Sequence, residues 1–179
     1  MINVIETERL ILRTWKDEDA EAYFQINRDA KVLDFLPGPL AMDVVKRFIS
    51  DKNQCFADHG YTLWAVEEKV TGVLIGFIGF QSPAWEAHFT PCIEIGWRLG
   101  SAYWGKGYAT EGAKAVLQYG FDHLGLKEIV SFTVPENLRS IRVMEKLGMN
   151  RDIDGDFFHP MLPLDHRLSK HVLYRLRVV

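Results

Sequence analysis

A glycine-rich turn between a strand and a helix is the segment of this 179-residue sequence best suited to chemistry. Hydrophobic residues alternate before the turn, which predicts a strand with one apolar face: Ile93, Ile95, Trp97 and Leu99. Small and apolar residues recur at helical spacing from Ala109 onward. A strand that runs through glycines into a helix leaves several backbone N–H groups unpaired, and the helix dipole adds positive charge there. The turn therefore predicts an anion site, most naturally for a phosphate.

Two other interpretations of this turn compete with a dedicated anion site. An ordinary strand-to-helix corner is the simplest of them, since such corners often contain glycine. A nucleotide-binding P-loop is the second, because Gly100, Gly105 and Lys106 match the first seven positions of G-x-x-x-x-G-K-[ST]. Gly107 then stands where the hydroxyl that ligates magnesium is required, so the P-loop pattern fails. The glycine spacing also departs from the dinucleotide-binding fingerprint.

Three segments resemble a known family. Residues 104–111, WGKGYATE, are similar to the acyl-CoA pyrophosphate loop of the GNAT superfamily of N-acetyltransferases, in detail its RimJ/RimL-like branch. The superfamily pattern Gln/Arg-x-x-Gly-x-Gly/Ala maps to Trp104, Gly107 and Ala109, and Trp104 departs from it. Residues 135–149, PENLRSIRVMEKLGM, resemble the pattern Asn-x-x-Ser followed by a helix ending Lys-x-Gly-Phe/Met, and the opening ETERLILR also resembles this branch. The resemblance covers nearly the whole chain.

The resemblance implies an acetyl-CoA-dependent N-acetyltransferase in which an amine attacks directly in a ternary complex, without a metal. Glu94 is the predicted base, and Ser140 is predicted to protonate or hydrogen-bond the departing thiolate, because the tyrosine that many members carry one turn later is Met144 here. The predicted acetyl-CoA-binding residues come from the strand, the turn and the following helix start: Ile95, Trp97, Leu99, Trp104, Gly105, Lys106, Gly107, Tyr108, Ala109, Thr110 and Asn137.

Each catalytic assignment has a structural alternative. Glu94 could be a surface carboxylate paired with Arg98 on the same strand face, and Ser140 could share helix capping with Asn137. At the level of the whole protein, the alternative is an acyl-CoA-binding sensor that keeps the loop amides without the catalytic side chains.

The remaining pattern predicts an α/β layered domain that spans residues 1–179 as a single unit. Its sheet is expected to be mixed and mostly antiparallel, with about seven strands. The resemblance adds helices on both faces, a splay between the fourth and fifth strands, and an acceptor pocket bordered by the connection 35–39. Expected strands are 8–15, 62–68, 73–81, 93–99, 128–134, 151–157 and 171–178; expected helices begin near residues 17, 42, 109 and 137. The loop 82–90 is expected to act as a lid over the acceptor.

Composition restricts partners and location. The net charge of −3 argues against non-specific nucleic-acid binding. No run approaches the roughly 18 apolar residues of a membrane span, and the N-terminus lacks the apolar core of a signal peptide. Cys55 and Cys92 have no C-x-x-C spacing, which favours a reducing cytoplasm.

The ligands are expected to be acetyl-CoA and an amine, either a protein N-terminus or a small molecule. Glu86, Glu94 and the acidic balance favour a cationic acceptor. No metal site is predicted, because the three C-terminal histidines lack a helical i, i+4 pair or a cysteine partner. The sequence leaves open whether the protein is a monomer or a homodimer.

Overall fold

The architecture is one sheet of eight strands in the order β1-β2-β3-β4-β5-β6-β8-β7. The structure is a computed structural model and describes residues 1–178. The strands are β1 (Asn3–Glu6), β2 (Leu10–Arg13), β3 (Leu63–Glu68), β4 (Val73–Gln81), β5 (Glu94–Leu99), β6 (Glu128–Thr133), β7 (Asn150–Phe158) and β8 (Lys170–Arg177). The helices are α1 (Asp19–Ile26), α2 (Ala30–Leu33), α3 (Met42–His59), α4 (Tyr108–Asp122) and α5 (Leu138–Lys146), with a 3₁₀ turn at Ser101–Tyr103.

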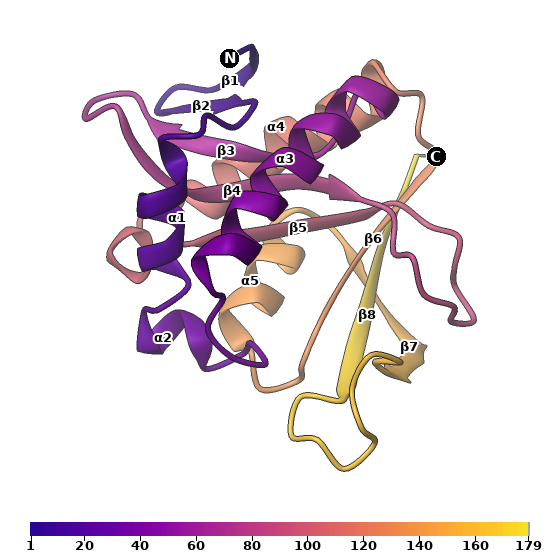
Figure 1. The fold of residues 1–179 in the computed structure, drawn as a ribbon. Coiled ribbons are helices and arrows are strands. Elements are labelled where there is room, and N and C mark those ends of the chain that lie inside the picture. Colours follow the sequence, from indigo (N-terminus) through magenta and orange to yellow (C-terminus); the bar gives the residue numbers. More distant parts are fainter. Residues whose placement is uncertain (179) are drawn as a thin grey trace.

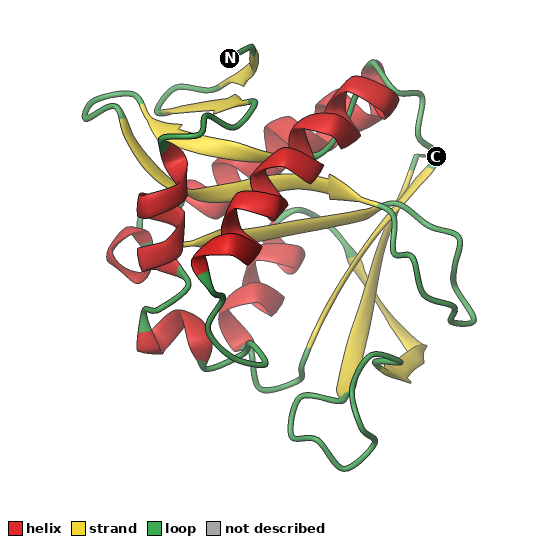
Figure 2. Cartoon of the chain, viewed as in Figure 1, coloured by secondary structure: helices red, strands yellow, loops and turns green. Residues whose placement is uncertain are grey.

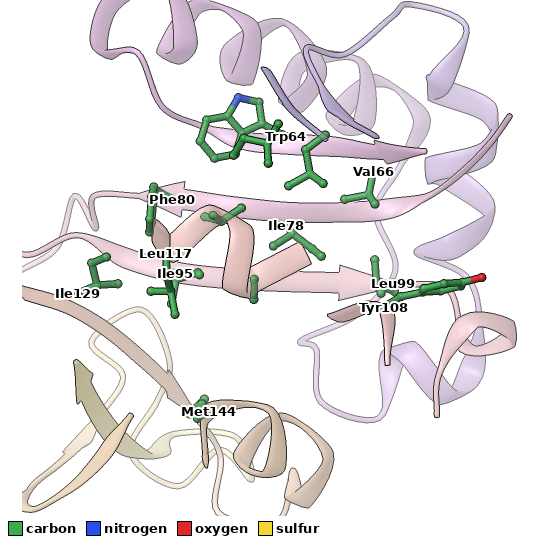
Figure 3. Close-up of a cluster of buried hydrophobic side chains, with 14 of the residues drawn as sticks. Trp64, Val66, Ile78, Phe80, Ile95, Leu99, Tyr108, Leu117, Ile129 and Met144 are labelled. Carbon is green, nitrogen blue, oxygen red and sulfur yellow. The ribbon is translucent and has the colours of Figure 1, made fainter. Parts of the chain in front are cut away.

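Helices cover both faces of the sheet, as Figures 1 and 2 show. Strand alternation explains this arrangement, because successive side chains of a strand point to opposite faces. In β3, Leu63 and Ala65 pack with the cluster beneath α1 and α3, whereas Trp64 and Val66 join the larger cluster beneath α4. Figure 3 shows part of this larger cluster, in which Met144 of α5 lies apart from the side chains of β3, β4 and β5.

The sheet opens between β5 and β6, the one parallel pair in the described chain. Only Glu94 and Val130 are in register there, whereas β4 and β5 pair along six positions. Past this point the two strands diverge in Figure 1. The predicted mixed, mostly antiparallel sheet with a splay at this position is confirmed.

The sheet has one strand more than expected. The predicted first strand, residues 8–15, is only the second arm of a hairpin whose first arm is β1. A tight turn joins them, in which the backbone N–H of Thr7 donates to the carbonyl of Leu10 and the N–H of Leu10 donates to the Thr7 hydroxyl. Four residues are too few for a clear alternating pattern, which is why the sequence did not reveal β1.

Both glycines of β4 lie where the backbone of a neighbouring strand approaches closely. A Cβ at Gly76 would lie 2.0 Å from the carbonyl oxygen of Arg98, and one at Gly79 would lie 2.0 Å from that of Thr62. Neither position has room for a side chain, so glycine lets β3, β4 and β5 pair closely next to the candidate site.

Among residues 1–178, none of the helices has the length and hydropathy that crossing a bilayer requires.

Candidate active site

A cleft of about 830 Å³ opens at the splay and collects nearly all of the predicted site residues. Its walls come from β5, the turn before α4, β6, α5, the α2–α3 connection and the β7–β8 connection. Every predicted site residue lines it except Lys106. The Lys106 side chain is exposed, and its ammonium lies 5.3 Å from the ring centroid of Tyr103, so the geometry does not bring it into the cleft.

The start of α4 presents free backbone amides to this cleft. Gly105 and Gly107 adopt left-handed backbone angles, with φ of 74° and 86°, which glycine allows without strain. The first hydrogen bond of the helix runs from the N–H of Glu111 to the carbonyl of Gly107, so the amides of residues 108–110 have no intrahelical acceptor. No side chain caps this end. The turn therefore has the construction of an anion site at a helix N-terminus.

A hydrogen-bonded cluster from the β1–β2 hairpin holds this turn in place. The Arg9 guanidinium donates through Nε to Glu111 at 2.6 Å and through Nη1 to the carbonyl of Lys106 at 3.0 Å. It also lies 4.5 Å from the Tyr108 ring centroid. The Thr7 hydroxyl donates to the second Glu111 oxygen at 2.6 Å. The segments ETERL and WGKGYATE, which are distant in sequence, meet in this cluster.

A row of basic side chains on α5 was missed by the sequence analysis. Arg139, Arg142 and Lys146 all line the cleft, and the guanidinium of Arg139 lies 4.8 Å from the Trp104 ring centroid. Their i, i+3 and i+7 spacing places them on one helix face, a signal that was available in the sequence. Three cations beside a set of free amides suit a ligand with several phosphate groups.

Trp104 occupies the position at which the sequence departs from the superfamily pattern. Its indole N–H donates to the carbonyl of Leu99 at 2.8 Å, and this bond ties the turn to the end of β5. The tryptophan thus fixes the turn to β5 through its indole N–H and makes a cation–π contact with Arg139.

Glu94 is buried, with only 8% of its surface exposed, and it opens into the cleft from the start of β5. It accepts a hydrogen bond from Gln81 at 2.9 Å. Burial raises its pKa to about 7, and this rise outweighs the opposing effects of Gln81 and of the Lys52 charge. The alternative of a surface ion pair with Arg98 is wrong, because the Arg98 guanidinium instead donates to Asn27 at 2.6 Å.

Ser140 and Asn137 stand at the start of α5 and line the same cleft. The Asn137 side chain accepts from the backbone N–H of Ser140 at 3.3 Å and donates to the Thr133 hydroxyl at 3.2 Å, so its capping role is present. The hydroxyl of Ser140 has no hydrogen-bond partner among the described residues. It remains available to donate to a ligand in the cleft.

Two other chemistries find little support in the site. Burial and the nearby Glu94 charge raise the pKa of Cys92 to about 11, so this thiol is not a ready nucleophile. Within residues 1–178, no three His, Cys, Asp or Glu side chains gather in an arrangement that could hold a metal ion. His159 and His171 do lie together, with ring centroids 5.2 Å apart.

The end of the cleft away from α4 agrees with the expected pocket border but differs from the expectations for the loop 82–90 and for Glu86. Phe35, Leu36 and Pro37 line it, in agreement with the expected pocket border. The loop 82–90 contributes nothing to the lining, because its aromatic residues pack against β6 and β7 instead of covering the cleft. Glu86 is exposed on that loop, so it adds no negative charge to the cleft.

Comparisons with known proteins agree with this geometry. The family described as acetyltransferase (GNAT) domain matches residues 9–150. The uncharacterized N-acetyltransferase YnaD of Bacillus subtilis (strain 168) is 33% identical over 160 residues, which cover 89% of this chain and 88% of YnaD. The crystal structure of a GNAT-family acetyltransferase from Bacillus anthracis is 30% identical, covers 97% of both chains and superposes with a TM-score of 0.78.

A more distant solved structure contains the expected cosubstrate. The microcin C7 self-immunity acetyltransferase MccE, in complex with acetyl-CoA and AMP, shares the fold with a TM-score of 0.77 at 17% identity, over 96% of this chain and 94% of MccE. The GNAT family uses acetyl-CoA, and the amides of α4 with the cations of α5 are groups that its phosphates require. The match over residues 9–150 and the relatives that cover nearly the whole chain show that this protein belongs to the GNAT family of acetyltransferases.

Proposed function

We propose that the protein transfers the acetyl group of acetyl-CoA to a primary amine by direct attack while both substrates are bound. The observation that carries the proposal is the position of Glu94: a buried carboxyl group with a pKa of about 7 opens into the same cleft as the anion site of α4. A base of this pKa can accept a proton near neutral pH, where most free amines are protonated. No protein nucleophile is needed.

One part of the cleft would bind acetyl-CoA, and another would carry out proton transfer from the amine. The amides at the start of α4, with Arg139, Arg142 and Lys146, would hold the phosphates of acetyl-CoA. Acetyl-CoA supplies an activated acyl group when bound. Glu94 takes a proton from the incoming amine, directly or through water. Unpaired N–H groups of β5 past Glu94 can stabilise negative charge on the carbonyl oxygen. The Ser140 hydroxyl donates to the departing sulfur.

The finer assignments rest on the sequence segments quoted above. We place the chain in the RimJ/RimL-like branch because ETERLILR, WGKGYATE and PENLRSIRVMEKLGM occur together. We further propose that residues 1–179 form one N-acetyltransferase domain. A reducing cytoplasmic location is supported by two free cysteines, Cys55 and Cys92.

The test is a Ser140→Ala variant, with Ser82→Ala as the matched control because Ser82 is exposed on the loop that leaves the cleft uncovered. Thiol release from acetyl-CoA with an amine panel measures turnover, and calorimetry measures acetyl-CoA binding. We expect Ser140→Ala to lose about 10²-fold in kcat, as removal of a general acid does, while acetyl-CoA affinity stays within about twofold of the unmodified protein.

Two results would count against this proposal. Unchanged kcat in Ser140→Ala would remove Ser140 from the mechanism. Tight acetyl-CoA binding by the unmodified protein without turnover of any amine would refute the transferase and favour the sensor.

A further inference from the structure

The end of the cleft away from α4 is the place left for the acceptor, and its walls are tied together. The α2–α3 connection forms one wall, and the β7–β8 connection forms the other. Arg167 of the β7–β8 connection donates to the backbone carbonyl of Asp34 at 2.7 Å, which joins the two connections. An acceptor must therefore fit between two linked segments.

The walls of this acceptor end are apolar. Side chains that line it include Phe35, Leu36, Phe132, Met161, Leu162 and Leu168. They come from three separate parts of the chain, so apolar side chains line this end from more than one wall. Such a lining favours an acceptor whose body loses apolar surface to it on binding.

The fixed charges that β5 and α2 bring to the cleft are mainly positive. Glu94 is the one acidic side chain in the described cleft lining, whereas Lys31 of α2 and Arg98 of β5 also line the cleft. Arg98 is held in place by Asn27, which is fully buried and itself donates to the carbonyl of Tyr23 at 2.7 Å. One carboxyl group can receive one amine, and the two cations oppose a second positive charge.

The two histidines at this end add polarity without negative charge. The backbone N–H of Met161 donates to Nδ1 of His159 at 3.3 Å, so the proton of a neutral ring lies on Nε2. Nδ1 of His171 lies 3.1 Å from the carbonyl oxygen of Ser169, so its proton lies on Nδ1. Burial lowers the pKa of both rings, which keeps them neutral at pH 7.

We propose that the acceptor is a monoamine with an apolar or aromatic body, and that Lys31 and Arg98 exclude amines that carry a second positive charge. This inference rests on the proposed transfer to an amine and specifies its substrate class. It narrows the cationic acceptor expected from the sequence to one with a single positive charge, because Glu86 lies outside the cleft and the lining carries more positive than negative side chains.

The experiment compares two probes of equal length, octylamine and 1,8-diaminooctane, with 2-phenylethylamine and spermidine as a second pair. The full chain is assayed at saturating acetyl-CoA by thiol release, and acetyl-CoA binding is measured separately by calorimetry. We expect kcat/KM for octylamine to exceed that for 1,8-diaminooctane at least tenfold, and 2-phenylethylamine to exceed spermidine by a similar factor.

Charge reversal identifies the residue responsible. Lys31→Glu changes an exposed residue of α2, so the fold should persist, and it should reduce the octylamine preference at least fivefold. Lys127→Glu makes the same charge change at an exposed position outside the cleft and should leave the preference unaltered.

The possible outcomes distinguish a failure of this acceptor proposal from a failure of the proposed acetyl transfer. Turnover of spermidine or 1,8-diaminooctane as fast as that of the monoamines would overturn the inference and leave the transferase standing. An equal effect of Lys31→Glu and Lys127→Glu would overturn the role of Lys31. Acetyl-CoA binding without turnover of any amine would overturn both.

Discussion

Replacing Glu94 by Gln is expected to stabilise the protein at alkaline pH while it removes activity. The carboxyl group is buried, and its burial raises the pKa from the ordinary value of 4.5 to about 7. Groups that face it are Gln81 from β4 and the Lys52 charge, and neither offsets the cost of burial. A glutamine keeps the acceptor oxygen that Gln81 uses but carries no charge.

The magnitude follows from the two pKa values. Between pH 4.5 and 7 the unfolded chain has lost this proton and the folded chain still holds it, so the free energy of unfolding falls as pH rises through this window. One pKa unit corresponds to about 1.4 kcal/mol, so ionised Glu94 costs the fold about 3 kcal/mol above pH 7. The Gln variant does not bear this cost.

Urea unfolding at pH 5 and pH 8.5 measures the effect. The difference in unfolding free energy between Glu94→Gln and the unmodified protein should grow by about 2 to 3 kcal/mol from the lower to the higher pH. With a urea slope of about 2 kcal/mol per molar, the midpoint difference should grow by about 1 M. Other carboxyl groups are common to both proteins and cancel from this comparison.

Activity provides the second half of the test. In the unmodified protein, kcat/KM should rise with pH up to about 7, as Glu94 loses its proton and becomes a base. Glu94→Gln should lose about 10²-fold or more in kcat/KM and also lose this pH dependence.

The control is Glu86→Gln, which removes an exposed carboxylate and should shift the urea midpoint equally at both pH values. A stabilised Glu94→Gln that keeps full activity would show that the carboxyl group is buried without being the base. Equal stability differences at both pH values would refute the burial argument itself.

Two further variants test the loop that precedes α4. Gly107→Ala should weaken acetyl-CoA binding about tenfold, because φ at this position is 86° and a Cβ would lie 3.4 Å from Arg9. The control is Gly125→Ala, where φ is 64° and no atom lies within 4 Å of the added Cβ. Both variants should lose about 1 kcal/mol of stability, but Gly125→Ala should leave calorimetric binding of acetyl-CoA unchanged. Arg9→Met should raise KM for acetyl-CoA about tenfold with kcat nearly unchanged, Arg9→Lys should restore part of it, and exposed Arg28→Met should have no effect. Equal loss of affinity in both glycine variants, or a fall in kcat alone for Arg9→Met, would contradict the positioning role.

Local patterns predicted the elements that form the cofactor end of the cleft. Alternation identified β5, the glycine pair identified the turn, and Asn137 marked the start of α5. These signals are local, since a strand pattern, a left-handed turn and a helix cap each depend on a few neighbouring residues.

The acceptor end could not be read in the same way, because it is assembled from distant segments. Glu94 lies on the polar face of its strand, and its burial comes from tertiary neighbours such as Gln81 of β4. Arg98 is two positions further along the same face, yet its partner Asn27 lies in the connection after α1. Sequence spacing predicted an ion pair between Glu94 and Arg98, but in the folded chain each has another partner, Gln81 and Asn27.

The Thr7–Arg9–Glu111 cluster explains why an acidic residue is compatible with an anion site. Glu111 lies in the first turn of α4, where a free carboxylate would be stabilised by the helix dipole but would also repel a phosphate. Its oxygens are instead turned toward Thr7 and Arg9, and the Arg9 charge compensates that of the carboxylate. The amides of residues 108–110 and the cations of α5 are then left for the ligand. The opening hairpin contributes no side chain to the cleft, and its contribution to cofactor binding is to position this turn and to balance its charge.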